Sequence, residues 1–329
     1  MPKAPAPLKR PGVKLGLRFT AVESAGLYFP GGKAAYPSSL IMLVVPAQVA
    51  GVGRIVVCSP PSKYGRSDLV LTACHELKLS DVYRAGGAAA IAALAFGTAT
   101  IPKVDKIVGP GNIYVQLAKR ALAGCVGIDG FLGPSEILTI ADDSGKADFI
   151  AADLLAQAEH DPGSCFLLTT SKSLAEAVRS EVEKQLATLP RRAAAEKALK
   201  NHSAIIIGES MDQLILLADR FAAEHVNIQT RDDQAVVKKL RNAGAIFVGP
   251  YSAVAAGDYV AGPSHCLPTN TTARFSSGIS VYEFLKRSSV AHYEAEGLRA
   301  DAEAIVAMAE AEGLEGHARS VKVRAQKTK

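Results

Sequence analysis

Hydrophobic and polar positions along the chain follow one repeated rhythm: a short apolar, often β-branched run, a turn, and then a stretch with helical spacing. Residues 106–108 form such a run, Gly109, Pro110 and Gly111 form the turn, and residues 112–123 have helical spacing. Short apolar runs bounded by turn residues indicate strands. We predict strands at residues 54–58, 81–84, 106–108, 136–141, 165–170, 203–208, 225–230 and 245–249.

Strands that alternate with helices predict parallel sheets covered by helices on both faces. The strands fall into two sets of about four, divided near Gly133, so we expect an α/β protein with two similar Rossmann-like, doubly wound domains. The expected boundaries are a basic, proline-rich lead (1–27), a first half (28–137), a second half (138–282), and a helical arm with a basic tail (283–329). We expect the site at the carboxyl ends of the strands and in the crevice between the domains.

The net charge of +5 by itself suggests an anionic partner such as nucleic acid. Ten of the 37 basic residues, however, lie in residues 1–20 and 319–329, which contain no acid, and the rest of the chain has 27 basic against 32 acidic residues. No interior run interleaves basic and aromatic residues, and the chain has no Trp. The pattern therefore argues against a nucleic-acid-binding protein.

The cysteines and the apolar stretches indicate the compartment. The five cysteines are odd in number, widely spaced and free of C-x-x-C pairs, which favours a reducing environment. The charge-free stretches 34–53 and 85–102 are interrupted by Pro or Gly, so we interpret them as buried strand–helix segments and not as membrane spans. We expect a cytoplasmic protein with no membrane partner.

Two motifs could bind a ligand, and each has a plainer interpretation. The turn 109–112 follows a strand and opens a helix, so its amides could receive a phosphate, but a tight turn explains the glycines equally well. Gln157 and His160 are three residues apart on one helix face and could bind one metal ion, or they could form an ordinary polar helix end.

Other candidate residues lie further along the chain. Glu224 and His225 could be a general acid–base pair or a surface pair. Asp258 and His265 lie in a Gly- and Pro-rich segment that could carry ligands or only turns. Glu312 and His317 lie near the end of the chain, and taken alone they would be interpreted as solvated residues. Cys125 and Cys266 have no neighbouring base in the sequence, so we interpret them as passive thiols.

The residues of these motifs, and the order of the motifs along the chain, resemble those of the histidinol dehydrogenase family. The resemblance covers the chain from about Ala25 to Arg324. The segments that carry it are residues 28–39, 106–115, 133–138, 151–161, 224–225, 257–259 and 273–277.

The resemblance implies an NAD-dependent enzyme of histidine biosynthesis that oxidises L-histidinol to L-histidine through the aldehyde, with two NAD and one zinc ion per subunit. It also implies a homodimer in which Glu312 and His317 reach the site of the partner subunit. Glu224 and His225 would be catalytic, with His225 taking the hydroxyl proton and Glu224 activating water. Transferred motif by motif, the resemblance implies the zinc ligands Gln157, His160, Asp258 and His317. The same four residues would contact the substrate, together with Ser135, His225, His265 and Glu312. Tyr28 and Asn112 would contact NAD.

Three departures from the family pattern stand out. Ala89 replaces a glutamine that would contact NAD, and Ala223 replaces a proline before Glu224. A lead of about twenty basic, Pro-rich residues stands where a helical segment normally precedes the motif at Tyr28, so we expect a compact form with altered assembly. Two alternatives stay open: a related zinc-dependent dehydrogenase of another polar or amino alcohol, and a catalytically silent zinc-binding paralogue.

Overall fold

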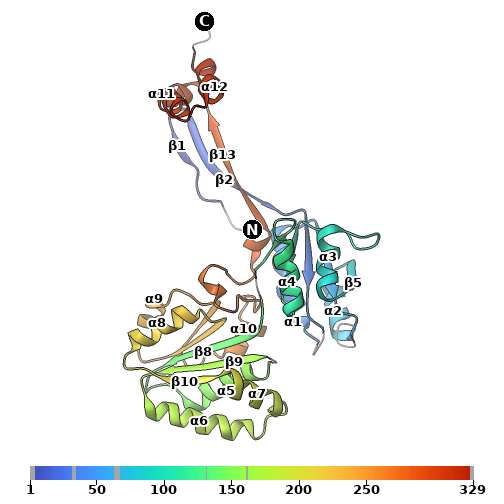
Figure 1. Ribbon diagram of the computed structural model, residues 1–329, viewed down its shortest axis with the longest axis vertical. Helices are drawn as coiled ribbons and strands as arrows, with labels where there is room; N and C mark the ends of the chain where they lie inside the picture. Colours follow the sequence, from blue (N-terminus) through green and yellow to red (C-terminus); the bar gives the residue numbers. More distant parts are fainter. Residues whose placement is uncertain (1–3, 32–34, 63–66, 131, 161, 327–329) are drawn as a thin grey trace. The chain divides into compact units, whose positions relative to one another are not determined.

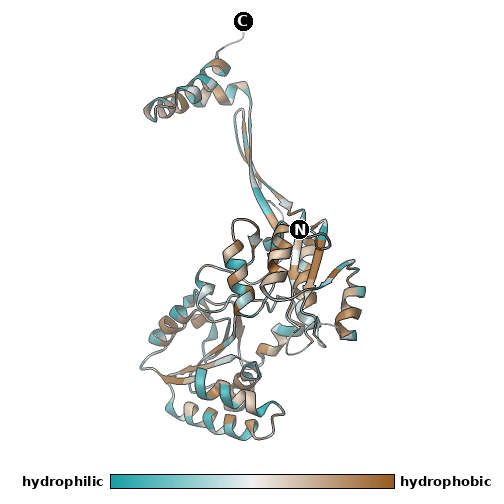
Figure 2. Ribbon diagram, turned by 45° about the vertical axis from the view of Figure 1, so that its right-hand side comes forward, coloured by the Kyte–Doolittle hydropathy of each residue, from teal (hydrophilic) through white to brown (hydrophobic). Residues whose placement is uncertain are grey.

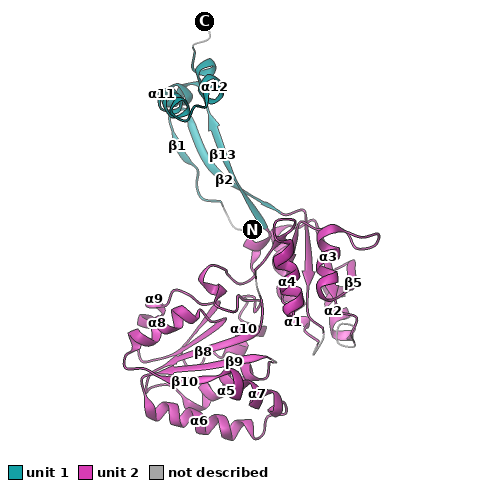
Figure 3. Cartoon of the chain, viewed as in Figure 1, with its two compact units in different colours: residues 1–21, 285–329 teal, residues 22–284 magenta. Residues whose placement is uncertain are grey.

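The computed structural model describes the chain except for residues 1–3, 32–34, 63–66, 131, 161 and 327–329. It divides into two compact units (Figure 3): Met1–Ala21 with Leu285–Lys329, called unit 1, and Val22–Phe284, called unit 2. The sequence-based boundaries treated the two ends as separate pieces, whereas the structure joins them in one unit because they pair as strands.

The first sheet of unit 2 is parallel, with the strand order β5-β4-β3-β6-β7. Val56, Ile91 and Ile107 are buried in the core between this sheet and helices α3 and α4. Figure 2 shows hydrophobic residues along the strands and helices, with hydrophilic residues between them. The elements are β3 (Ser24–Tyr28), α1 (Pro37–Ala50), β4 (Arg54–Ser59), α2 (Asp68–Glu76), β5 (Asp81–Arg84), α3 (Gly87–Phe96), β6 (Lys106–Val108), α4 (Ile113–Leu122) and β7 (Gly127–Ile128).

The second sheet of unit 2 repeats this topology, with the order β10-β9-β8-β11-β12. Because successive strand residues point to opposite faces, Ile137 packs with α5–α7 on one face and Leu138 packs with α8 and α9 on the other (Figure 1). The elements are β8 (Ser135–Ala141), α5 (Ala147–Ala158), β9 (Gly163–Thr169), α6 (Lys172–Leu186), α7 (Arg192–His202), β10 (Ala204–Ile207), α8 (Met211–Phe221), β11 (His225–Gln229), α9 (Asp233–Lys239), β12 (Ala245–Val248) and α10 (Val254–Tyr259).

The prediction of two doubly wound parallel sheets is therefore confirmed, with five strands in each sheet where about four were expected. In both sheets the first strand in sequence lies in the middle, between the second and the fourth. This arrangement creates a topological switch point, where open α/β sheets bind ligands. The switch points lie between β3 and β6 and between β8 and β11.

Unit 1 corrects two expectations. The lead forms β1 (Leu8–Arg10) and β2 (Val13–Ala21), and the expected helical arm begins with the strand β13 (Leu285–Tyr293) before α11 (Ala295–Ala311) and α12 (Glu315–Ala325). All nine residues of β13 pair antiparallel with β2. The strand was missed because its partner lies more than 260 residues away. Among the described residues, no helix is long and apolar enough to cross a membrane.

Candidate active site

The amino ends of β8 and β11 place Glu224 and His225 beside Ser135 and Glu136. The two strands are parallel neighbours, with His225 opposite Ile137. The Glu136 amide donates to Glu224 Oε2 at 2.9 Å, and the Ser135 side chain also hydrogen-bonds the Glu224 carboxyl group. His225 Nδ1 lies 3.2 Å from the Glu136 carbonyl oxygen and 3.5 Å from Glu224 Oε2. The two candidate catalytic side chains are therefore held by the first two residues of β8.

Burial sets the protonation of this pair. Both residues are about 95% shielded from solvent. Burial raises the pKa of Glu224 well above its ordinary value and lowers the pKa of His225 to about 4. Because a carbonyl oxygen can only accept, His225 Nδ1 carries the proton that it donates to Glu136, and Nε2 keeps its lone pair. The pair therefore presents a neutral imidazole base beside a carboxyl group whose pKa burial has raised.

The end of α5 supplies Gln157 and His160. Gln157 is buried, and its Nε2 has no hydrogen-bond partner within the part of the chain that the structure describes. His160 is exposed as a residue, yet desolvation by the surrounding atoms lowers the pKa of its ring, against the opposing charge of Asp258. A buried amide without a partner and an imidazole kept neutral suit a zinc site, because metal ligation requires deprotonated nitrogen.

Asp258 and His265 lie together, close enough to His160 for their charges to act on its pKa. His265 Nδ1 is 3.1 Å from the Asp258 carbonyl oxygen and 3.9 Å from its carboxylate, and Nε2 is 2.9 Å from Ser39 Oγ. Burial raises the pKa of Asp258, while His265 and His160 act in the opposite direction. Ser39, near the start of α1, was missed as a site residue although it ends one of the family-like segments.

The location of the second-sheet residues corrects the sequence-based expectation. They lie at the amino ends of β8 and β11 and just before β9, not at the carboxyl ends. The reason is that the segment after α10 folds back over these amino ends, where Gly133 N donates to Thr269 Oγ1 at 2.8 Å and Asn270 N donates to Glu136 Oε1 at 3.1 Å. That segment brings His265 to the cluster.

The remaining predicted residues of this group, Glu312 and His317, belong to unit 1. Glu312 ends α11, His317 lies in α12, and both are exposed. Three of the four predicted zinc ligands thus lie in unit 2 and the fourth in unit 1. Within the described ranges, no three His, Cys, Asp or Glu side chains are grouped so that they could hold a metal ion, and the Gln157 amide is a ligand of another type.

The carboxyl ends of the first sheet form a separate hollow of about 650 Å³. Tyr28 Oη accepts the Gly87 amide at 3.2 Å, and Asn112 caps α4 by accepting the amides of Tyr114 and Val115, each at 3.1 Å. Both predicted NAD residues therefore line this hollow. Its lining residues are Tyr28, Pro60, Pro61, Arg84, Ala85, Gly86, Gly87, Ala89, Ala90, Ala93 and Asn112.

A buried ion pair supports the turn beside this hollow. Lys119 and Asp129 have fully buried side chains and form a salt bridge. The Gly109 amide donates to Asp129 Oδ2 at 2.6 Å, and Lys119 Nζ donates to the Gly109 carbonyl at 3.0 Å. Gly109 has φ of 120°, and a Cβ there would lie 1.9 Å from the Tyr28 carbonyl oxygen. The ion pair therefore fixes a peptide that only glycine can form.

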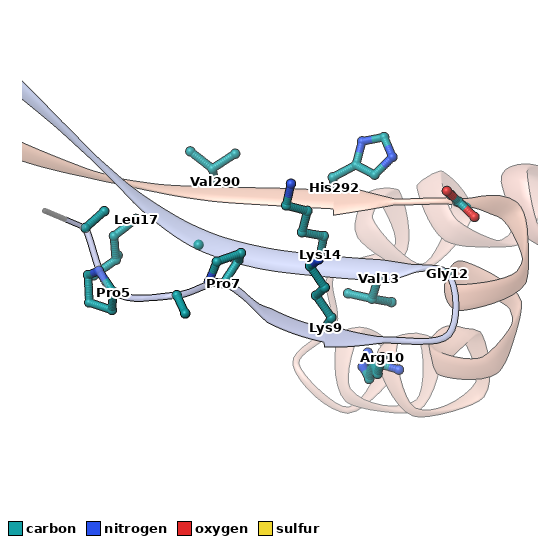
Figure 4. A pocket seen from close by; sticks show the side chains of 14 residues that line it. Pro5, Pro7, Lys9, Arg10, Gly12, Val13, Lys14, Leu17, Val290 and His292 are labelled. Atoms are coloured by element: carbon teal, nitrogen blue, oxygen red, sulfur yellow. The ribbon is translucent and has the colours of Figure 1, made fainter.

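A further groove, of about 900 Å³, lies in unit 1 against β1, β2 and β13 (Figure 4). Lys9, Lys14 and His292 are paired across the three strands in one row. None of the predicted site residues lines it. The predicted site residues other than Glu312 and His317 all lie in unit 2.

Comparison with known proteins identifies the family. The pattern of the histidinol dehydrogenase family matches residues 3–325. The histidinol dehydrogenase of Geobacillus kaustophilus is 53% identical over 321 residues, which are 97% of this chain and 76% of that protein. The chain belongs to the histidinol dehydrogenase family. The family resemblance inferred from the motifs is confirmed, and membership makes the chain an NAD-dependent oxidoreductase of histidine biosynthesis.

Other relatives agree with this assignment to the histidinol dehydrogenase family. The histidinol dehydrogenase of Bacillus subtilis is 52% identical over 97% of this chain and 75% of that protein. A crystal structure of histidinol dehydrogenase from Elizabethkingia anophelis, 38% identical, has a TM-score of 0.94 and covers 98% of this chain and 75% of that one. A γ-glutamyl phosphate reductase from Thermotoga maritima, 12% identical with a TM-score of 0.56, shows a similar fold only.

Relative to the family pattern, the departure at Ala89 falls on the predicted NAD side. Ala89 is exposed and lines the hollow beside Tyr28 and Asn112. Arg84, which ends β5 and also lines the hollow, was missed by sequence reasoning, although a basic residue at the carboxyl end of a strand is a usable signal for an anionic ligand. A cation here suits a dinucleotide phosphate.

Proposed function

We propose that this chain oxidises L-histidinol to L-histidine through bound histidinaldehyde, reducing two NAD. The observation that carries the proposal is the buried Glu224–His225 pair, held by Ser135 and Glu136. In the first oxidation His225 Nε2 takes the hydroxyl proton while a hydride passes from the carbinol carbon to NAD. In the second, Glu224 removes a proton from the water that adds to the aldehyde, and a second hydride passes to a second NAD.

We further propose one zinc ion per subunit, held by Gln157, His160 and Asp258 with His317 of the partner subunit. Zinc would supply a Lewis acid that orients the imidazole and amine nitrogens of the substrate without changing its own oxidation state. Ser135, His265 and Glu312 of the partner subunit would contact the substrate, and Tyr28 and Asn112 the dinucleotide. The lowered pKa of His160 and the buried Gln157 Nε2, which has no hydrogen-bond partner among the described residues, support this ligand set.

The stoichiometry of NADH tests the function. With the zinc-loaded protein, we expect about two NADH per L-histidinol consumed, loss of turnover with a chelator, and recovery with zinc. Spectrophotometric NADH counts with metal analysis on the same samples measure this. Zinc binding with no NADH from histidinol would overturn the proposal. It would favour either the catalytically silent paralogue, which the Ala89 departure supports, or a dehydrogenase of another amino alcohol. A panel of amino alcohols would distinguish these two.

A mixed-dimer experiment tests the shared site. We expect His317→Ala and Glu224→Gln homodimers to form no histidine in the steady state and an equal mixture, after subunit exchange, to recover about a quarter of the wild-type rate of histidine formation. Half of the dimers would be mixed, with one intact site of two. As a matched control, His317→Ala mixed with Glu312→Ala should recover nothing, because both changes affect the same contributing segment. Equal recovery in both mixtures, or none in either, would contradict a site shared between subunits.

A further inference from the structure

Glu136 contacts both candidate catalytic residues through its main chain. Its amide donates to Glu224 Oε2 at 2.9 Å, and its carbonyl accepts from His225 Nδ1 at 3.2 Å. The orientation of this one residue therefore decides where the Glu224 carboxyl group lies and which nitrogen of His225 keeps a free lone pair. Anything that fixes residue 136 fixes both groups.

The Glu136 side chain is itself buried, and its charge acts on Glu224, whose pKa it raises. Its Oε1 accepts the Asn270 amide at 3.1 Å, and Oε2 is buried with no hydrogen-bond partner among the residues the structure describes. Burial raises the pKa of this carboxyl group. A buried carboxyl group used only to hold one backbone amide is expensive to keep, which argues for a role in the site.

The loop that Glu136 holds has a strained backbone. Asn270 and Thr271 have φ of 53° and 63°, in the left-handed region that a β-branched residue such as Thr271 rarely adopts. Such residues persist only when surrounding contacts enforce them. Two hydrogen bonds supply such contacts here. The Asn270 amide donates to the Glu136 carboxyl group, and the Gly133 amide donates to the Thr269 hydroxyl at 2.8 Å. The loop and the start of β8 thus hold one another in place.

We propose that Glu136 is a positioning residue for the reaction: by tying the loop at Asn270 to the start of β8, it holds His225 in the Nδ1-protonated tautomer and aligns Glu224. The proposal rests on the proposed function for its kinetic consequence. Glu136 does not touch substrate in this scheme, and the same loop carries His265. Loss of the tie should therefore slow both oxidations and leave NAD binding in the first sheet unchanged.

The test compares two substitutions of similar size. Glu136→Gln keeps an acceptor for the Asn270 amide and should retain kcat within about threefold, whereas Glu136→Met removes the acceptor and should lower kcat about 10- to 100-fold, as expected for small misplacements of catalytic groups. The KM for NAD and the zinc content should stay at wild-type values. Equal kcat in Glu136→Met and wild type would overturn the proposal, as would equal losses in the two variants.

A second readout does not depend on turnover. Nitrogen-15 NMR of protein labelled in its seven histidines, with His225 assigned by His225→Asn, should show Nδ1-protonated imidazole in wild type and Glu136→Gln and a mixture of tautomers in Glu136→Met. If wild type does not oxidise histidinol, the proposed function fails while these spectra still decide the role of Glu136. An unchanged tautomer in Glu136→Met would overturn that role.

A matched control separates positioning from loss of stability. The Asp219 carboxylate also holds a loop by backbone amides, those of Arg241 and Asn242 at 2.7 and 2.9 Å, but it touches no site residue. Asp219→Asn should lower Tm and leave kcat and the His225 tautomer unchanged. If Glu136→Met does not fold, Glu136→Asp, which shortens the reach by one methylene, takes its place with the same expected kcat loss.

Discussion

Glu224→Gln is expected to separate the two oxidations, leaving alcohol oxidation and stopping the aldehyde step. Gln keeps an acceptor for the Glu136 amide but cannot take a proton from water, so oxidation of supplied histidinaldehyde should fall about 10²- to 10⁴-fold. His225 stays in place, so the first turnover with L-histidinol should still release one NADH. Rapid-mixing measurements with each substrate, the alcohol reaction run with an aldehyde trap, resolve the two steps.

The pH dependence gives the same prediction an independent signature. Burial raises the pKa of Glu224 above its ordinary value, and the ionised form is the base. Aldehyde oxidation should therefore fall, as pH drops, through a pKa higher than that of a free glutamate, and Glu224→Gln should lack this limb. Glu283→Gln is the control. Glu283 is half-buried and lies away from the site, and its Oε2 is 2.9 Å from Lys106 Nζ. A full two-NADH yield in Glu224→Gln would contradict the assignment.

The local pattern of the sequence predicted eight of the ten strands in the two sheets of unit 2, missing β3 and β7, and none of the strands of unit 1. The strands at β5 and β6 have the predicted limits because each lies between a helix and a turn that the residues themselves specify. β2 and β13 lack such local signals, since each is stabilised mainly by the other from the far end of the chain. A short window of residues contains only one of the two strands, so the pairing that stabilises them cannot be predicted from it.

The candidate site was predictable in its residues and not in its geometry. Glu224 and His225 are adjacent in sequence, so the motif shows them, but their partner Glu136 lies 88 residues earlier and is visible only once β8 and β11 pair. The general rule for parallel sheets expects a ligand at the carboxyl end of a strand, where Tyr28 lies, and it fails for Ser135, which lies at the amino end of β8. It fails because the segment after α10 folds over the amino ends of the second sheet, a tertiary event that no periodicity encodes.

Lys119→Met is expected to have the largest effect on stability. It leaves Asp129 as a buried, unpaired carboxylate against the Gly109 turn, and breaking one partner of a buried pair costs about 3–5 kcal/mol in the free energy of unfolding. The lost bond from Nζ to the Gly109 carbonyl adds to this cost. Urea unfolding followed by circular dichroism, with the wild type alongside, gives the difference.

The double variant Lys119→Met with Asp129→Asn should recover most of that loss. Asn still accepts the Gly109 amide, and neither member of the former pair is charged. A double-mutant cycle would then show strong coupling between the two positions. As a matched control, the exposed pair of Arg192 and Glu196 lies on the surface of α7, and Arg192→Met should change stability by less than about 1 kcal/mol. If Lys119→Met costs no more than Arg192→Met, the ion pair does not hold the turn, and the rigidity of the Gly109 peptide must come from its packing against Tyr28 alone.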